Sequence, residues 1–241
     1  MNIFFGLIII AIGAFCQSSS YVPINKIKSW SWESYWIVQG VFAWLLFPLL
    51  GALLAVPAGE SLWGLFASHP KESLLTMMFG VLWGVGGLTF GLSMRYLGVA
   101  LGQSIALGTC SALGAILGPV LTGRAADLTS AVIIGVIVTL VGIAIIGVAG
   151  AMKSASMPEE EKKKAVKDFN FGKGLFVAVL AGLMSACFNI GLSFGAPLTW
   201  AETKPIFASL PATLLVTCGG FLTNAVYCFS QNTKNKTWGD Y

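Results

Sequence analysis

Four polar or aromatic side chains stand out because they lie inside stretches that are otherwise almost purely apolar. Trp83 lies among glycines near the middle of its stretch, and Gln17, Gln103 and Asn189 each place an amide in an apolar run. An indole offers an apolar platform for one face of a sugar ring, while amides bind hydroxyl groups. Helix packing and interhelical hydrogen bonds account for the same residues equally well. These residue types indicate either a site for a small polar molecule or the packing of a helical bundle.

Glu33 is a carboxylate that lies only two residues before an apolar stretch. It follows Lys26 and Lys28 and precedes the second apolar stretch, where an acidic residue stabilises the start of a helix. A buried carboxylate at that depth can also carry a proton across a membrane. Glu33 is therefore a candidate for proton coupling, with helix capping as the alternative.

The residues that most enzymes need are missing. The chain has one histidine, His69, and it contains no Ser-His-Asp set, no phosphate-binding loop and no cluster of metal ligands. All five cysteines fall within apolar stretches without a CxxC spacing, so neither a disulfide framework nor a metal site is predicted. We expect a protein without catalytic residues, metal or cofactor.

The elements that must position these side chains are long apolar segments. The chain is 56% hydrophobic and only 10% charged, against roughly 25% charge in soluble domains. Each segment reaches the ~20 residues that a helix needs to cross a bilayer, and none has a charged residue in its interior. The sequence predicts an all-α polytopic membrane protein, a bundle of seven transmembrane helices. The predicted spans are Ile3–Val22, Tyr35–Val56, Leu74–Met94, Leu97–Leu121, Ala131–Met152, Gly174–Ala196 and Phe207–Phe229.

Positive charges alternate between the two sides of this predicted bundle. All but three of the 14 Lys and Arg residues follow the first, third, fifth and seventh stretches, and the exceptions are Lys71, Arg124 and Lys204. Positive charge marks the cytoplasmic side, so a bacterial inner-membrane protein with a periplasmic amino terminus is predicted. Met1-Asn2 lacks the positive start of a signal peptide, which favours a retained first span. The net charge of +4 reflects cytoplasmic lysines and gives no reason to expect nucleic-acid binding.

The charged connection 153–173 divides the chain after the fifth stretch. We expect a first five-helix repeat at 1–152, a cytoplasmic linker at 153–173, and the first two helices of a second repeat at 174–241. An odd number of spans before the linker inverts the second repeat, as in many secondary transporters. The two repeats align weakly, with Gln17 and Asn189 at equivalent positions.

Small residues at four-residue spacing predict close helix packing. The third and fourth spans, separated only by Arg95-Tyr96, are expected to form a tight hairpin, with Arg95 anchoring its cytoplasmic end. The glycine pairs are Gly80/Gly84, Gly87/Gly91, Gly98/Gly102 and Gly114/Gly118.

Three motifs resemble the L-rhamnose–proton symporter family, a branch of the drug/metabolite transporter superfamily. They are Lys26-Ile-Lys-Ser-Trp-Ser-Trp-Glu33, Phe79-Gly-Val-Leu-Trp-Gly-Val-Gly86 running into Gly91-Leu-Ser-Met-Arg-Tyr-Leu-Gly98, and Phe169-Asn-Phe-Gly-Lys-Gly-Leu175. The resemblance runs from the first span through the seventh. It implies two inverted five-helix repeats and import of L-rhamnose with protons.

Within the matching motifs, the resemblance covers Trp83, Glu33, and the pair Arg95 and Tyr96 as a cytoplasmic anchor or gate. The partners that it implies are a small sugar, a coupling proton and the lipid bilayer. The family has ten spans, so the chain is expected to lack the last three and to leave the second repeat incomplete; a true seven-span variant is the alternative.

Other functions remain open on the sequence alone. Within transport, an exporter or exchanger of another small metabolite is the main alternative to proton-coupled sugar import by alternating access. From other classes come a membrane enzyme that acts on a lipid-linked sugar and a sugar-binding membrane partner without transport. Transport is favoured because the connections are too short to hold a catalytic or signalling domain.

Overall fold

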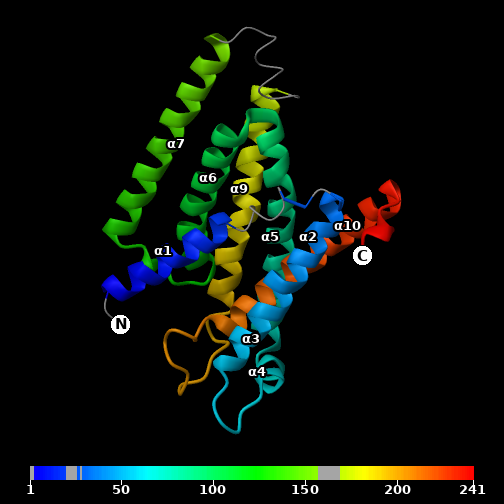
Figure 1. Ribbon diagram of the computed structural model, residues 1–241. Coiled ribbons are helices and arrows are strands. Elements are labelled where there is room, and N and C mark those ends of the chain that lie inside the picture. Colours follow the sequence, from blue (N-terminus) through cyan, green and yellow to red (C-terminus); the bar gives the residue numbers. More distant parts are fainter. Residues whose placement is uncertain (1–2, 20–25, 28, 157–168) are drawn as a thin grey trace. The chain divides into compact units, whose positions relative to one another are not determined.

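The computed structural model of the chain describes residues 3–19, 26–27, 29–156 and 169–241 (Figure 1). Every regular element within these ranges is helical. The elements are α1 (Ile3–Ser19), α2 (Trp32–Gly40), the π-helix η1 (Val41–Leu46), α3 (Phe47–Leu54), α4 (Leu62–Ser68), α5 (Pro70–Leu97), α6 (Val99–Leu121), the 3₁₀ turn η2 (Ala125–Asp127), α7 (Ser130–Ser156), α9 (Phe171–Phe194), α10 (Leu210–Asn235) and the 3₁₀ turn η3 (Trp238–Asp240). The all-α prediction is confirmed for the described residues.

Within the described ranges, six helical segments are long and apolar enough to cross a membrane, judged by length and composition. They are Trp32–Leu54, Pro70–Leu97, Leu101–Leu121, Ser130–Lys153, Phe171–Phe194 and Leu210–Asn235. These segments correspond to the second through seventh predicted spans. The first prediction coincides with α1, which has 17 residues and an apolar part of only Phe4–Cys16. A seventh span therefore stays a prediction.

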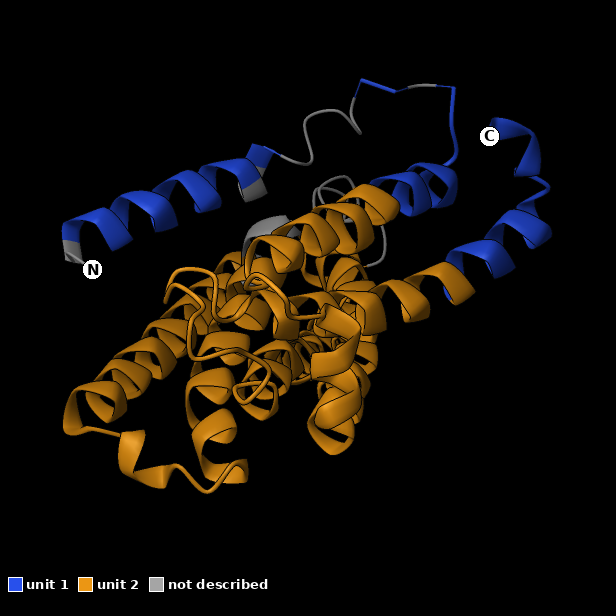
Figure 2. Cartoon of the chain, turned by 90° about the horizontal axis from the view of Figure 1, so that it is seen from below, with its two compact units in different colours: residues 1–39, 227–241 blue, residues 40–226 orange. Residues whose placement is uncertain are grey.

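The described residues form two compact units (Figure 2). Unit 1 consists of residues 1–39 and 227–241, and unit 2 of residues 40–226. The second and seventh predicted spans each contribute one part to unit 1 and the other part to unit 2. The expected division at 1–152, 153–173 and 174–241 stays a prediction, and most of the connection 153–173 lies outside the described residues.

One core cluster of unit 2 lies where α5, α6 and α9 meet. Leu97, Leu101 and Ile105 pack against Ala178 and Ala181 of α9. Alanines on α9 let the larger aliphatic side chains of α5 and α6 approach its backbone. This cluster packs the last turns of α5 against α6 and α9.

The predicted α5–α6 hairpin is confirmed, but its turn lies at another residue. Arg95 and Tyr96 belong to the last turn of α5, and Gly98 alone separates α5 from α6. Gly98 has a φ of +83°, a conformation that a side chain disfavours. Glycine at this position therefore permits the abrupt reversal, and the backbone of Gly102 then packs closely against Ser93 and Met94.

The glycine pairs divide into two groups. A methyl group added at Gly80 would collide with the backbone of Val216 on α10, and one at Gly114 would collide with Asn189 on α9. By contrast, Gly87 and Gly91 face open space. The close packing predicted for the Gly87/Gly91 pair is therefore wrong, because these two glycines lie on a face of α5 that meets no neighbour among the described residues.

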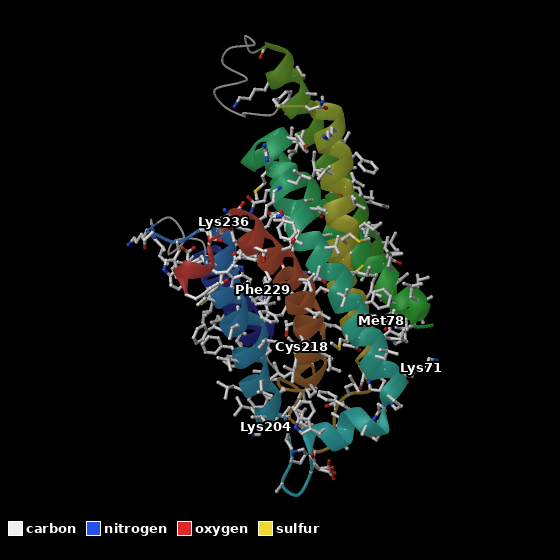
Figure 3. All side chains as sticks on the ribbon, turned by 90° about the vertical axis from the view of Figure 1, so that its right-hand side faces the viewer. Lys71, Met78, Lys204, Cys218, Phe229 and Lys236 are labelled. Atoms are coloured by element: carbon white, nitrogen blue, oxygen red, sulfur yellow. The ribbon has the colours of Figure 1, made fainter. Side chains whose placement is uncertain are left out.

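Charged residues of unit 2 separate along the helices. Lys71 and Arg95 lie at opposite ends of α5. Lys204 lies toward the same end of unit 2 as Lys71 (Figure 3). Lys173 lies at the other end, because its ammonium group sits 4.8 Å from the ring centroid of Tyr96. This separation agrees with the charge alternation in the sequence.

Candidate functional site

Trp83 lies at the middle of α5, and its indole is half-buried. Its ring centroid lies 5.0 Å from that of Phe188 on α9 and 5.9 Å from that of Trp44 in η1. Both contacts are edge-to-face, the arrangement that aromatic rings prefer. Three segments far apart in the sequence therefore meet at Trp83.

A fourth segment, α10, contacts the Trp83 ring at Gly220. A methyl group at Gly220 would lie within 2.5 Å of the Trp83 ring, so only glycine allows the indole to rest on the α10 backbone. Next to it, the buried Asn224 donates to the carbonyl oxygens of Gly220 at 2.8 Å and Gly84 at 3.4 Å. The Thr223 hydroxyl donates to the carbonyl of Val81 at 2.8 Å. These hydrogen bonds fix α10 against α5 beside Trp83.

Two members of this aromatic cluster, Trp44 and Phe188, were not among the sequence candidates. Trp44 had a usable signal, since it is a second tryptophan well inside a predicted span, where tryptophan is unusual. Phe188 had none, because phenylalanine is common in apolar helices. Only the packing of α9 against α5 singles it out.

The predicted amides lie in different surroundings. Asn189 follows Phe188 on α9 and is exposed, with its side chain against Gly114 of α6. Gln103 is exposed on α6, and among the described contacts none joins it to Trp83. The side chain of Gln17 lies outside the described residues. Of the three amides, Asn189 alone is adjacent in sequence to a residue that contacts Trp83, namely Phe188.

The carboxylate of Glu33 is buried in unit 1, with an exposed fraction of 7%. Its Oε1 accepts hydrogen bonds from Asn235 Nδ2 at 2.8 Å and from the Thr237 hydroxyl at 3.0 Å. Glu33 also opens α2, where the helix dipole favours negative charge. Both sequence interpretations of Glu33 therefore fit its position, as a helix-start acid and as a buried carboxylate.

A second carboxylate, Asp240, binds the residue that precedes α2. Its Oδ2 accepts from the Ser31 hydroxyl at 2.7 Å and from the Ser31 amide at 2.8 Å. The Ser31 hydroxyl also lies 2.8 Å from that of the fully buried Ser34. The hydroxyl and amide of Ser31 hold the pKa of Asp240 below its ordinary value, because both donate to its charged form.

Arg95 and Tyr96 lie at the end of α5 that meets the start of α9. The Tyr96 carbonyl accepts from the amide of Asn170 at 3.1 Å, and the Tyr96 ring lies beneath the ammonium of Lys173. Asn170 in turn caps α9 by accepting from the amide of Lys173. Arg95 is exposed at the same end. Two of the motifs singled out in the sequence therefore meet here.

No group of three or more His, Cys, Asp or Glu side chains that could hold a metal ion occurs in the described ranges. The contacts instead offer aromatic faces and amides in unit 2, and a hydrogen-bonded carboxylate in unit 1. Such groups can bind a neutral polar molecule and carry a proton.

The chain matches a family model described as L-rhamnose-proton symport protein over residues 1–238. It is 34% identical over 235 residues to an L-rhamnose-proton symporter of Cronobacter sakazakii, covering 93% of this chain and 66% of that protein. It is 33% identical over 248 residues to proteins of the same name from Klebsiella pneumoniae and Escherichia coli, covering 98% of this chain and 68% of each relative.

No solved structure shows significant similarity. The chain spans about two thirds of the length of the curated relatives that it matches. Together with the six apolar helices, the match shows a multi-pass membrane protein. The chain belongs to the L-rhamnose–proton symport protein family, whose members are transporters and not enzymes.

Proposed function

We propose that this protein is a secondary active transporter that imports L-rhamnose, or a closely related sugar, together with protons. The observation that carries the proposal is the family match over residues 1–238, with relatives named as L-rhamnose-proton symporters. The contacts around Trp83 and Glu33 support it, because they supply one group suited to a sugar and one suited to a proton.

The sugar site is proposed around Trp83. A pyranose ring has an apolar face that stacks on an indole, and the methyl group of a 6-deoxy sugar adds further apolar surface. Asn189, Gln103 and Gln17 are the proposed partners of the sugar hydroxyls. Asn189 has the strongest support, since it adjoins Phe188, whose ring lies against Trp83.

The proton site is proposed at Glu33. Glu33 is buried and accepts two hydrogen bonds, from Asn235 and Thr237. The strength of these hydrogen bonds depends on whether the carboxyl group is charged, so binding of a proton changes the stability of this part of unit 1. For a gradient to drive uptake, the proton must bind one conformation better than another, because equal affinity shifts no equilibrium.

Alternating access between two inverted halves is the proposed mechanism, with repeats at 1–152 and 174–241 joined by the linker 153–173. Arg95 and Tyr96 are proposed as a cytoplasmic anchor or gate. Their place where α5 meets α9 supports this role, because the two helices belong to different proposed repeats.

The proposed location is the bacterial inner membrane, with the amino terminus in the periplasm and the linker 153–173 in the cytoplasm. The separation of Lys71 and Lys204 from Arg95 and Lys173 along unit 2 supports one fixed orientation.

The test is the external pH of lightly buffered, de-energised cells that express the complete reading frame. Adding L-rhamnose should make the medium alkaline, because each sugar that enters brings a proton with it. Vector-only cells are the control and should show no shift. No shift in cells with verified expression would contradict proton-coupled L-rhamnose import.

A further inference from the structure

The end of α10 has an unusual backbone. Lys236 has a φ of +59°, and it is the only described residue other than glycine with a positive φ. The amide of Thr237 donates to the carbonyl of Asn232 at 3.0 Å. This bond and the left-handed residue form a Schellman motif, in which glycine usually takes the place of Lys236. Holding a lysine in this conformation is unfavourable, and such strain persists where the surroundings require it.

The strained turn brings Thr237 back onto Glu33. The Thr237 hydroxyl lies 3.0 Å from Glu33 Oε1 and 3.3 Å from Asn232 Oδ1. A hydroxyl has a single proton to donate, so it serves one of these acceptors at a time. A charged carboxylate is the stronger acceptor, because charge-assisted hydrogen bonds are roughly twice as strong as neutral ones.

The second acceptor is held in place for this exchange. Asn232 is fully buried, and its Nδ2 donates to the Tyr241 hydroxyl at 2.6 Å. Its Oδ1 therefore stays directed toward Thr237. When the better acceptor changes, the hydroxyl proton of Thr237 can turn from Glu33 to Asn232 without a prior rearrangement of the backbone.

We propose that the charge of Glu33 decides which acceptor the Thr237 hydroxyl binds, and that proton uptake by Glu33 releases the end of α10 from the start of α2. While Glu33 is charged, Thr237 and Asn235 both donate to Oε1 and tie the two helix ends together. Once Glu33 carries a proton, Asn232 Oδ1 becomes the better acceptor for Thr237, and the tie weakens. Thr237 and Asn235 are thus positioning residues, and the inference rests on the proposed role of Glu33 in proton coupling.

Other titratable groups face Glu33 within unit 1. Asp240 on η3 repels its charge, and the thiol of Cys228 on α10 lies within reach of its field. Asp240 binds Ser31 rather than Asn235 or Thr237, so it holds the same chain segment by a separate pair of hydrogen bonds. An Asp240→Asn variant separates its contribution from that of Glu33.

The experiment is amide hydrogen exchange of residues 232–241 in the complete protein in detergent, at one fixed pH. Glu33→Gln imitates the protonated carboxyl, and Thr237→Val removes the hydroxyl with little change of shape. Each variant should speed exchange about tenfold or more, because hydrogen bonds to charged groups contribute more to local stability than neutral ones do. The double variant should exchange no faster than the single ones, since both changes break the same tie.

Two controls separate the tie from general loosening. Thr139→Val removes a hydroxyl that donates to its own helix backbone on α7, and it should leave exchange at 232–241 unchanged. Lys236→Gly keeps the left-handed turn without strain, so it should not speed exchange there.

The inference is overturned if Glu33→Gln exchanges like the unmodified protein, because the charge would then not hold the segment. Uptake distinguishes this failure from failure of the proposed function. Thr237→Val should move the pH profile of L-rhamnose uptake to higher pH, because a carboxylate that loses a donor binds a proton more readily. An unchanged profile in Thr237→Val and full uphill accumulation in Glu33→Gln would remove Glu33 from coupling.

Discussion

At the scale of the residue, Trp83 is both firmly packed by its neighbours and partly accessible. Its ring is packed by Trp44, Phe188 and the backbone at Gly220, yet the side chain remains partly exposed. A platform for a ligand needs both features, because packing fixes the ring and exposure lets the ligand reach it.

Replacing Trp83 by alanine should weaken the apparent affinity for L-rhamnose by about tenfold, the effect of losing roughly 1.4 kcal/mol of binding free energy. Membrane insertion should be retained, because the third span stays apolar. Initial rates of labelled L-rhamnose uptake against concentration provide the measurement. The matched control is Trp63→Ala, since Trp63 on α4 is 70% exposed. Unchanged uptake kinetics in Trp83→Ala would exclude the indole from the site.

Asp240 should titrate at a lower pH than an ordinary aspartate, whose value is 3.8. A group with a depressed pKa stabilises the folded state above its unfolded pKa, and this contribution disappears as the pH falls through its folded pKa. The link between Ser31 and Asp240 should therefore survive mild acid and open only below the ordinary pKa of aspartate.

The titration can be followed by NMR of carboxyl-labelled aspartate in detergent. Ser31→Ala removes the hydroxyl donor and should move the midpoint of Asp240 upward. Equal midpoints in the two proteins would show that the serine hydroxyl does not hold the carboxylate.

At the scale of the element, α5 meets α10 backbone to backbone. Gly80 lies against Val216, and Gly219 of α10 lies against Met77, so each helix places a glycine where the other comes closest. Such close contacts strengthen the dispersion attraction between the two helices. They also allow hydrogen bonds between the helices, including the one from the Thr223 hydroxyl to the Val81 carbonyl.

Gly80→Ala should lower the stability of the folded protein by about 1–3 kcal/mol, because the added methyl group has no room. Gly91→Ala on the same helix should be neutral or stabilising by about 0.4–1 kcal/mol, since its methyl group meets open space and the unfolded chain loses freedom. Thermal unfolding in detergent compares the two variants. Equal melting temperatures would contradict the close contact of α5 with α10.

The helices themselves follow closely from the sequence, and their contacts do not. The apolar runs place six spans, because length and polarity set them locally. The glycine pattern did not distinguish Gly80 from Gly87, since spacing alone does not say which face of α5 meets a partner. The contact of the Phe188 ring with Trp83 could not be predicted from the sequence either, because it depends on how α9 packs against α5.

At the scale of the whole molecule, the charges predict one orientation in the membrane, which labelling can test. Single cysteines at Ala58 and Lys153, in a protein without its five native cysteines, lie at connections predicted to face opposite sides. A membrane-impermeant maleimide should label the cysteine at position 58 in intact cells, and the one at position 153 only after the membrane is opened. The reverse pattern would overturn the proposed topology.

The second span contains a π-helical turn, Val41–Leu46, directly before α3. An i→i+5 turn holds one residue more than an α-turn, so this turn accommodates an extra residue within the helix. Deleting one residue there would let the turn become a regular α-turn, with the flanking helices close to their present orientation. Ala52 would then keep its contacts with Leu62 and Leu214. The wide turn thus makes the length of the second span tolerant to the loss of one residue at this place, because the neighbours that α3 meets do not change.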